Sequence, residues 1–357
     1  MLIVEREALA FNDIIIPPRY STIKSRADIN ISSKLHTRSG AFYEFRLPLI
    51  SSPMDTVTGP EMCYRMVRHG GLGILHRFCT IEEQINMSEQ ARQIADREGD
   101  DGDLLLMGAA IGANGDYAER ALALVKAGIP IICVDIAHGH TEIMKIALTN
   151  LVNILPDYVH IMAGNIATRD AMLDLLKWGA DSVRVGIGSG AACSTSIQTG
   201  HGLPLLQSLL DVCDGGVPRN FSIIADGGIK KGGDAVKSFA AGANFCMLGS
   251  LLAGTKASPG EILNQDGRFM KNYRGSASQA AQQSQGKKKI YEEGVSSLVP
   301  YTGKIENILE KLENGIRSGL SYSGAHNLEQ FRQKVIAHRI TNEAYIQATP
   351  HILGKSL

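Results

Sequence analysis

The sequence predicts a closed (β/α)8 barrel, in which eight parallel strands alternate with helices. Short apolar runs rich in Val, Ile and Leu recur along the 357-residue chain, and each is followed by a Gly- or Ser-rich break and then by a helical pattern. Buried parallel strands are typically such continuous apolar runs. Eight of them are the number that closes a barrel, whereas a doubly wound sheet, the alternative, usually has fewer. The runs span residues 47–52, 72–77, 104–112, 129–138, 160–166, 182–188, 222–228 and 245–250.

The segments between the runs have helical periodicity, and several end in glycine as a helix C-cap does. Examples are residues 117–128, 169–180 and 232–243. We therefore expect the whole chain, 1–357, to form one barrel domain with two additions. A segment rich in Gln, Ser, Gly and Lys at about 276–294 has little to bury and predicts a mobile flap. Residues from about 321 to 357 form a C-terminal tail.

Composition and charge argue against several classes of partner. Lys plus Arg and Asp plus Glu balance at 36 each, so nucleic acid is not an expected partner. No apolar run approaches the ~20 residues that cross a bilayer, and the N-terminus lacks the basic start and cleavage site of a signal peptide. The six cysteines form no CxxC pair and no metal-ligand spacing with histidine. We expect a cytoplasmic protein with no membrane partner.

In such barrels the active site lies at the carboxyl ends of the strands. The loops expected there are rich in Gly, Ser, Asp and His. The Asp-Gly-Gly at 226–228 follows strand seven and the Gly-Ser at 249–250 follows strand eight, where barrels usually bind phosphate. These loops predict a phosphorylated ligand, with ordinary tight turns as the alternative. The G-x-G-x-x-A pattern at 186–191 is a weak dinucleotide signal, because no acidic residue follows about 20 residues later after a second strand.

One cysteine differs from the other five. Cys193 follows GIGSGAA, precedes Ser194 and Thr195, and lies on the loop after strand six. Backbone N–H groups in such a loop favour an anion, and the thiolate is the nucleophilic form of cysteine. The position predicts a catalytic nucleophile, with an inert loop cysteine as the alternative.

These loops resemble the IMP dehydrogenase/GMP reductase family. The similarity runs from about Phe11 to about Thr341, and the cysteine loop and the IADGG motif are its most specific parts. The resemblance implies that Cys193 attacks C2 of a purine nucleotide. That carbon becomes electrophilic only if the ring takes up negative charge or a proton, so a carboxyl group near the base is useful. The matching segments are SSPMDTVT, GGLGILHR, VDIAHGHT, MAGNIAT, VRVGIGSGAAC, IADGGI, MLGSLLAG, EEGV and NGIRSGLSYSGA.

The resemblance also implies roles for individual residues. Thr195 and Glu293 would move protons beside the Cys193 adduct, and backbone carbonyls of Gly188, Gly190 and Cys193 would bind a monovalent cation such as K⁺. The implied nucleotide-binding residues are Asp226 for the ribose hydroxyls, Gly228, Gly249, Ser250 and Tyr273 for the 5′-phosphate, and Ser52, Met54, Asn165, Arg184, Ser189, Gly227, Gly275 and Ser276. The residues implied beside the nicotinamide cofactor are Asp135, Ala137, His138 and Gly139.

Two reactions in the family share the covalent adduct. The dehydrogenase passes hydride from IMP to NAD and hydrolyses the adduct to XMP, using an Arg-Tyr pair on the flap to activate water. The reductase expels ammonia from GMP and takes hydride from NADPH to give IMP. The chain has no arginine between Arg274 and Arg317, which favours the reductase, as does the segment QTGHGLP after the cysteine. Residues 95–103 have space only for a loop, so the regulatory CBS pair of many dehydrogenases is missing there.

Some other residues resemble those of the dehydrogenases, and two features resemble neither enzyme. Arg184 stands where reductases usually have lysine, and the AHGH loop is of the dehydrogenase type. Ala191 replaces a usual phosphate-binding serine and YRGSAS replaces a glycine- and methionine-containing run, which leaves a preference for a deoxynucleotide open. We expect a homotetrameric, NADPH-dependent GMP reductase. The alternatives are an NAD-dependent IMP dehydrogenase and a nucleotide-binding paralogue without turnover.

Overall fold

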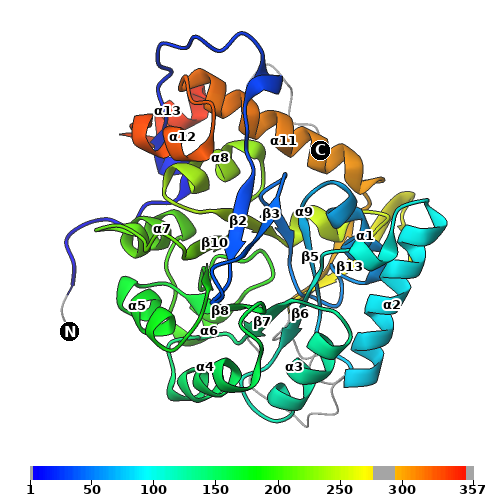
Figure 1. Cartoon of the computed structure of the whole chain (residues 1–357). Helices are drawn as coiled ribbons and strands as arrows, with labels where there is room; N and C mark the ends of the chain where they lie inside the picture. The colour runs from blue at the N-terminus through cyan, green and yellow to red at the C-terminus, as the bar shows by residue number, and fades with distance from the viewer. Residues whose placement is uncertain (1–2, 276–293, 351–357) are drawn as a thin grey trace.

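The computed structural model describes residues 3–275 and 294–350, and it confirms the predicted barrel. Eight parallel strands close in the order β10-β11-β4-β5-β6-β7-β8-β9, surrounded by helices (Figure 1). Each predicted run contains one strand, but most end earlier than predicted because their last residues form the site loops; β9, for example, ends at Val185, and Gly186 has a φ of 146°. The strands are β4 (Leu49–Ser51), β5 (Leu72–Leu75), β6 (Gly108–Ile111), β7 (Ile131–Asp135), β8 (His160–Ile166), β9 (Ser182–Val185), β10 (Ser222–Asp226) and β11 (Phe245–Leu248).

The helices cover the outside of the barrel, and their ends follow the sequence signals. Thr80 caps the second helix in a capping box with Glu83, which satisfies backbone N–H groups of its first turn. Gly128, Gly179 and Gly242 each have positive φ just after a helix, as predicted from their C-cap positions. The helices are α1 (Pro60–Arg68), α2 (Ile81–Arg97), α3 (Tyr117–Lys126), α4 (Glu142–Ile154), α5 (Arg169–Lys177), α6 (Thr195–Thr199), α7 (Leu205–Cys213), α8 (Gly232–Ala240), α9 (Ser250–Ala253) and α11 (Ile305–Tyr322).

The segment after the eighth strand departs from the predicted alternation of strands and helices. Only the short α9 follows β11 directly, and a small antiparallel sheet comes next, made of β12 (Leu263–Gln265), β13 (Arg268–Arg274) and β14 (Ser296–Pro300). The long α11 then packs against α8 and serves as the eighth outer helix. The predicted flap lies between β13 and β14, and residues 276–293 are outside the described part of the chain.

A hairpin closes the amino end of the barrel. It consists of β2 (Ser33–His36) and β3 (Phe42–Phe45), which the sequence did not reveal as strands. Its Leu35 and Phe45 pack into the barrel interior, where the Phe45 ring meets Phe245 edge-on at 5.7 Å. The interior side chains come from alternate strand positions, as in other barrels. They include Ile50, Leu72, Ile74, Ala110, Ile131, Cys133, Met162, Ile224, Phe245 and Met247.

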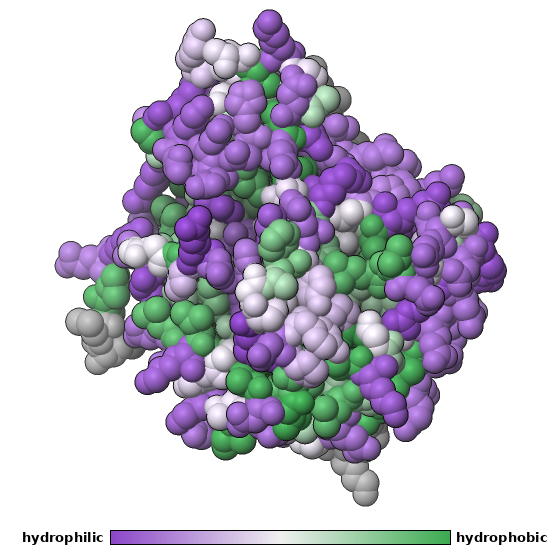
Figure 2. All heavy atoms as spheres, in the orientation of Figure 1, coloured by the Kyte–Doolittle hydropathy of each residue, from purple (hydrophilic) through white to green (hydrophobic). Residues whose placement is uncertain are grey.

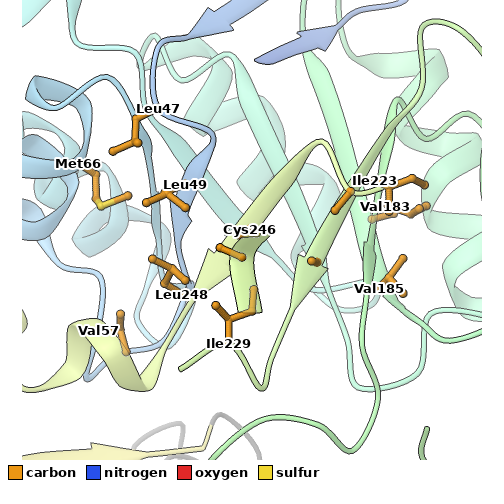
Figure 3. Close-up of a cluster of buried hydrophobic side chains, with 14 of the residues drawn as sticks. Leu47, Leu49, Val57, Met66, Val183, Val185, Ile223, Ile229, Cys246 and Leu248 are labelled. Atoms are coloured by element: carbon orange, nitrogen blue, oxygen red, sulfur yellow. The ribbon is translucent and has the colours of Figure 1, made fainter. Parts of the chain in front are cut away.

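A second, larger apolar core lies between the strands and the helices. Figure 3 shows part of it, where Leu49, Cys246 and Leu248 from the strands meet Val57 and Met66 from outside the barrel. All five side chains are almost completely buried. This two-sided burial explains why each strand reads as a continuous apolar run rather than as an alternating one.

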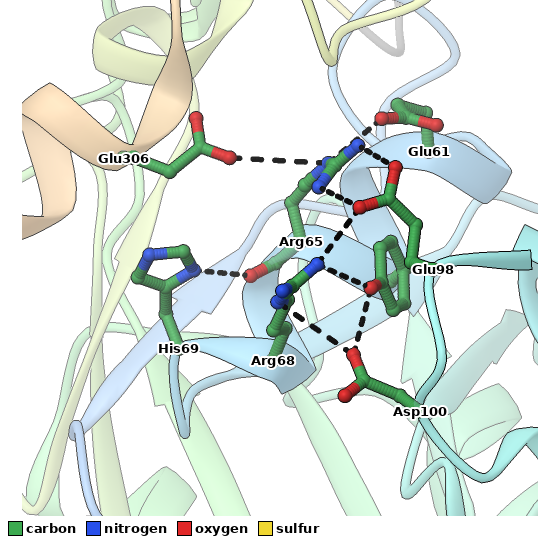
Figure 4. Close-up of polar contacts among 8 residues, drawn as sticks. Glu61, Arg65, Arg68, His69, Glu98, Asp100 and Glu306 are labelled. Atoms are coloured by element: carbon green, nitrogen blue, oxygen red, sulfur yellow. Dashed lines mark hydrogen bonds and ion pairs between the residues drawn. The ribbon is translucent and has the colours of Figure 1, made fainter. Parts of the chain in front are cut away.

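The turn after α2 is held by ionic contacts to α1 (Figure 4). Glu98 accepts hydrogen bonds from Arg65 at 3.1 Å and from Arg68 at 2.9 Å, and Asp100 accepts one from Tyr64 at 2.7 Å. From there the 3-10 helix η3 (Gly102–Leu104) leads into β6. The turn is therefore short and tied down, as predicted for a chain without a module inserted at 95–103.

The described part of the C-terminal tail packs on its own chain. It contains α12 (Leu328–Lys334), β15 (His338–Arg339) and α13 (Asn342–Gln347). β15 pairs with β1 (Ile14–Ile15), and the side chain of Phe331 is fully buried. Asn30 and Asn327 form a further bridge between the two ends of the chain.

Hydrophilic residues dominate the periphery of the face shown in Figure 2, with smaller hydrophobic groups between them. Exposed apolar side chains include Leu122 on α3, Ile143 and Ile146 on α4, and Leu173 on α5. Among the described residues, no helix is both long and apolar enough to cross a membrane. All six cysteines are free thiols.

Candidate active site

A cavity of about 350 Å³ opens at the carboxyl ends of the strands. Most of the residues that the sequence implied for catalysis or binding line it. They are Ser52, Met54, Asp135, Ala137, Asn165, Arg184, Gly188, Gly190, Cys193, Thr195, Asp226, Gly227, Gly228, Gly249, Ser250, Tyr273 and Gly275. Two others, Ser276 and Glu293, lie outside the described residues.

Cys193 projects from the loop between β9 and α6. Its Sγ lies 3.2 Å from Oγ1 of Thr195, the first residue of α6, and its backbone N–H donates to the Gly190 carbonyl at 3.0 Å. The thiol is only partly buried, whereas Cys133 and Cys246 are fully enclosed, and burial raises the pKa of Cys133 to about 11. Cys193 therefore differs in location from the strand cysteines: it is a thiol that lines the cavity and has a hydroxyl beside it.

The two described ends of the flap are bonded to the cysteine loop. Gly294 forms an antiparallel bridge with Cys193, and the N–H of Val295 donates to the Ala192 carbonyl at 3.0 Å. On the other side, the N–H of Gly275 donates to the Val295 carbonyl at 3.0 Å. A Cβ atom on Gly275 would lie 2.8 Å from the Ala192 carbonyl oxygen, so glycine is required for this close approach. The flap therefore begins and ends beside the thiol.

Arg184 lies between two carboxylates under the cavity. Its Nη1 is 2.5 Å from Asp135 Oδ1, and its Nη2 is 2.8 Å from Asp226 Oδ2. The residue is only 5% exposed. Burial alone would lower the pKa of Arg184, but the charges of Asp226 and Asp135 raise that pKa overall. Burial alone would raise the pKa of Asp135, but the charges of Arg184 and Arg77 lower that pKa overall. Arg184 is thus held as a cation by its neighbours, with little surface left to bind a nucleotide directly.

Asp226 is oriented by several donors that converge on one oxygen. Its Oδ2 accepts from Nη2 and Nε of Arg184 at 2.8 and 3.2 Å, and from Nδ2 of Asn165 at 2.8 Å. Asn165 Nδ2 also donates to the Gly186 carbonyl at 2.8 Å. Within the described residues no donor reaches Oδ1 of Asp226, so this oxygen is free to accept hydrogen bonds from a ligand hydroxyl.

Three loops meet at the side of the cavity where a phosphate was predicted. The hydroxyl of Tyr273, at the end of β13, lies 3.9 Å from Met54 Sδ. A Cβ atom on Gly249 would lie 3.1 Å from the same hydroxyl. Burial, followed by the charges of Asp226 and Cys193, raises the pKa of Tyr273 to about 12. Tyr273 therefore offers a neutral hydroxyl beside the Gly249 backbone.

Three predicted residues do not line the cavity. Ser189 turns its hydroxyl toward the Asp226 carbonyl, at 3.4 Å, and its Oγ would lie 2.8 Å from a Cβ on Gly227. Gly139 packs on the strand beside it, with its N–H donating to the Asn165 carbonyl at 2.7 Å. His138 is exposed outside the cavity. Sequence position alone could not separate these residues from their cavity-lining neighbours, because adjacent loop residues point in different directions.

Sequence reasoning missed Arg77 and Phe78, which follow β5 and line the cavity. Nε of Arg77 lies 3.7 Å from Asp135 Oδ2. Arg77, Asp135, Arg184 and Asp226 thus form a row of alternating charge across the barrel mouth. The available signal was the segment LGILHR, which places an arginine at the carboxyl end of a predicted strand.

The described residues contain no cluster of His, Cys, Asp or Glu suited to a metal ion. The predicted K⁺ ligands are backbone carbonyls, which such clusters do not include. Gly188 and Gly190 both line the cavity wall near Cys193, and the Gly190 carbonyl accepts the Cys193 N–H. A carbonyl oxygen has two lone pairs, so this bond leaves it able to contact a cation as well.

The fold and the cavity define a (β/α)8-barrel protein whose cavity, at the carboxyl ends of the strands, is lined by a thiol, an oriented carboxylate and the glycine-rich loops after strands seven and eight. The model of the IMP dehydrogenase / GMP reductase domain matches residues 8–351. The chain belongs to this family, whose members are NAD(P)-dependent purine nucleotide oxidoreductases.

Relatives of both named activities match almost the whole chain. An inosine-5′-monophosphate dehydrogenase of Nitrosopumilus maritimus is 32% identical over 473 aligned positions, covering 97% of this chain and 98% of the relative. A GMP reductase of Leishmania major is 29% identical, covering 98% of each chain. The solved structure of a Cys-to-Ala variant of Trypanosoma brucei GMP reductase with guanosine 5′-monophosphate superimposes with a TM-score of 0.89 at 27% identity, covering 98% of each chain. The family is thus established, and both activities occur among the relatives.

Proposed function

We propose that this protein is a GMP reductase that converts GMP, NADPH and two protons into IMP, NADP⁺ and an ammonium ion. Cys193 Sγ forms a bond to C2 of GMP, and the bond from C2 to the 2-amino nitrogen breaks as that nitrogen leaves as ammonia. NADPH supplies the hydride that reduces C2 of the resulting adduct. The bond between sulfur and C2 then breaks, which releases IMP and restores the thiolate.

The residues around the cavity support this chemistry. We assign proton transfer to the departing nitrogen to Thr195, whose hydroxyl lies 3.2 Å from the thiol, and to Glu293, which is outside the described residues. Asp226 offers its free Oδ1 to the ribose hydroxyls, and Tyr273 and the loops at Gly249 and Gly228 are suited to the 5′-phosphate. The GMP-bound reductase structure from T. brucei, which shares the fold at a TM-score of 0.89, supports GMP as the ligand.

The choice of reductase over dehydrogenase rests on one observation, the ion pair between Arg274 and Asp55. It is the last arginine before the flap, and the next one in the chain is Arg317. Arg274 Nε donates to Asp55 Oδ2 at 2.9 Å, and Asp55 raises its pKa through that hydrogen bond. An arginine activates water only if it loses a proton or can approach the water closely, and the ion pair with Asp55 opposes both. A dehydrogenase must activate water, whereas a reductase need not.

IMP dehydrogenase is the second candidate, and specific observations favour it. Arg184 replaces the lysine usual in reductases, and the N. maritimus dehydrogenase is more similar, at 32% identity, than the L. major reductase at 29%. A paralogue that binds nucleotide without turnover is a third candidate, motivated by Ala191. The cavity-lining positions of Cys193 and Thr195 argue against it.

The remaining assignments follow from the family. The proposed cofactor half of the cavity contains Phe78 and Arg77, and Nε of Arg77 is buried without a hydrogen-bond partner. K⁺ on the carbonyls of Gly188, Gly190 and Cys193 would order the cysteine loop. We further propose a cytoplasmic homotetramer.

Two absorbance assays at 340 nm on the purified protein test the proposal. One contains GMP and NADPH, and the other contains IMP, NAD⁺ and K⁺. Loss of NADPH absorbance with the first mixture, and no NADH from the second, is the expected result. Appearance of NADH together with XMP would establish the dehydrogenase instead. Nucleotide binding by calorimetry with neither absorbance change would support the paralogue.

A further inference from the structure

We propose that Arg77 binds the carboxamide oxygen of the nicotinamide cofactor and so determines how the cofactor ring sits against the nucleotide. Arg77 lies directly after β5 and lines the cavity. Among the described residues the Arg77 guanidinium group meets no acceptor within hydrogen-bond distance, and its Nε, 3.7 Å from Asp135 Oδ2, is buried without a partner. An arginine has five N–H donors, and a donor left without an acceptor is unfavourable. Because Arg77 lines the cavity, its remaining donors are available to a ligand acceptor.

The nearest carboxylate does not satisfy Arg77, because another arginine holds it. Asp135 Oδ1 is 2.5 Å from Arg184, whereas Asp135 Oδ2 is 3.7 Å from Arg77 Nε, which is too long for a hydrogen bond. Arg184 donates to both Asp135 and Asp226 and is only 5% exposed. The Arg77 side chain is 25% exposed. The two cavity arginines thus differ: Arg184 is fully engaged within the protein, and Arg77 has donors to spare.

The strand order separates Arg77 from the nucleotide residues. Cys193, Asp226 and Gly249 follow β9, β10 and β11, which are neighbours in the barrel, and the next strand around the barrel is β4. β5, which carries Arg77, lies across the barrel from β9. With the nucleotide on the first group of loops, the space beside β5 to β7 is left for the second ligand, which this family takes as a nicotinamide cofactor.

The chemistry of hydride transfer identifies the part of the cofactor involved. The nicotinamide ring must approach the purine C2 that is bonded to Cys193, so this end of the cofactor enters the same cavity. The Phe78 ring also lines the cavity, and the Arg77 guanidinium lies 5.2 Å from its centroid, so an apolar ring lies next to the proposed donor. The acceptor oxygen at that end is the carboxamide oxygen. A pyrophosphate oxygen has the same acceptor chemistry, and the experiment distinguishes the two sources.

The test measures equilibrium affinities in the Cys193→Ala background, where no turnover occurs. NADPH, NAD⁺, ADP-ribose and GMP are each titrated into three proteins: the Cys193→Ala protein that retains Arg77, and the same protein carrying R77Q or R77K. We expect R77Q to weaken NADPH and NAD⁺ binding roughly 10- to 100-fold, the loss of a charged hydrogen bond, with GMP affinity changed less than about threefold. R77K should recover part of the loss, because it keeps the charge but not the planar fork. ADP-ribose, which lacks nicotinamide, should bind all variants equally.

Arg38→Gln is the matched control, because Nε of Arg38 is also buried without a partner but lies away from the cavity, beside Asp157 and Asp181. It should leave all four affinities unchanged. Equal losses of GMP and cofactor affinity in R77Q would overturn the proposal and make Arg77 a structural member of the charge row. Weaker ADP-ribose binding by R77Q would assign Arg77 to the pyrophosphate and overturn the carboxamide assignment. Unchanged affinity of R77Q for all four ligands would also overturn the proposal. The inference holds for either direction of the reaction, so a failure of the GMP reductase proposal in the 340 nm assays leaves it separately testable.

Discussion

Nη1 of Arg184 lies 2.5 Å from Oδ1 of Asp135, in a pair of which both side chains are largely buried. A buried ion pair of this kind stabilises little on balance, because desolvating two charges offsets their attraction. Its consequence is orientation. Arg184 also holds one oxygen of Asp226, so the carboxylate proposed to bind the ribose is positioned by a residue that is itself only 5% exposed.

Replacing Arg184 by lysine should therefore weaken nucleotide binding. A lysine ammonium is a single point charge and cannot hold Asp135 and Asp226 with the geometry of a planar fork. We expect GMP affinity to fall roughly tenfold, the equivalent of one charged hydrogen bond, while the unfolding temperature changes little. Calorimetric titration of GMP into R184K and the unaltered protein measures this. Equal affinities would mean that Asp226 is positioned by Asn165 alone.

Adding a methyl group at the base of the flap should reduce turnover more than stability. The Cβ atom of Gly275→Ala would meet the Ala192 carbonyl oxygen at 2.8 Å and push the flap base away from the cysteine loop. Displacements of this size at a reacting group lower rates roughly 10- to 100-fold, and we expect kcat to fall by that factor. Gly233→Ala on α8 is the control, because its Cβ would meet nothing within 4 Å. A Gly275→Ala protein with normal kcat would show that the flap base tolerates movement.

The closed end of the barrel should control acid stability. Burial lowers the pKa of His160 to about 4, and its ring bonds the His36 carbonyl at 2.6 Å and the Ser182 hydroxyl at 2.7 Å. Between about pH 6.5 and 4 the unfolded chain binds a proton that the folded chain excludes, so stability is lost as the pH falls through this window. The loss amounts to roughly 3 kcal/mol.

His160→Gln should remove that loss. Denaturant unfolding at several pH values, compared between the variant and the unaltered protein, measures it. The difference is the test rather than the absolute curve, because burial raises the pKa of Asp181 to about 6 and acts in the opposite sense. Parallel stability curves for the two proteins between pH 6.5 and 4 would contradict the assignment to His160.

The sequence predicted the barrel strands well, because a strand buried on both faces leaves an unbroken apolar run. It did not reveal the hairpin of β2 and β3, in which only Ser33, Leu35 and Phe45 are buried and the apolar pattern is correspondingly weak. It placed the eighth helix directly after β11, whereas β12 to β14 intervene. A short three-stranded insertion has no strong periodicity and is hard to recognise in advance.

Some features of the candidate site could likewise be predicted from the sequence, and others could not. Local motifs predicted which loops meet at the cavity, since the carboxyl ends of barrel strands necessarily do. They did not predict partners far apart in sequence, such as Arg184 with Asp135, or the unsatisfied donors of Arg77. Those depend on side-chain directions across the barrel, which a single sequence does not contain.

The most direct test of the central claim is the ratio of ammonia released to NADPH oxidised in the presence of GMP. If Cys193 attacks C2 and expels the amino group before reduction, the unaltered protein should release one ammonia for each NADPH consumed. Cys193→Ala should release none, although it still binds GMP. Oxidation of NADPH without ammonia, or full ammonia release by Cys193→Ala, would contradict the covalent reductase mechanism.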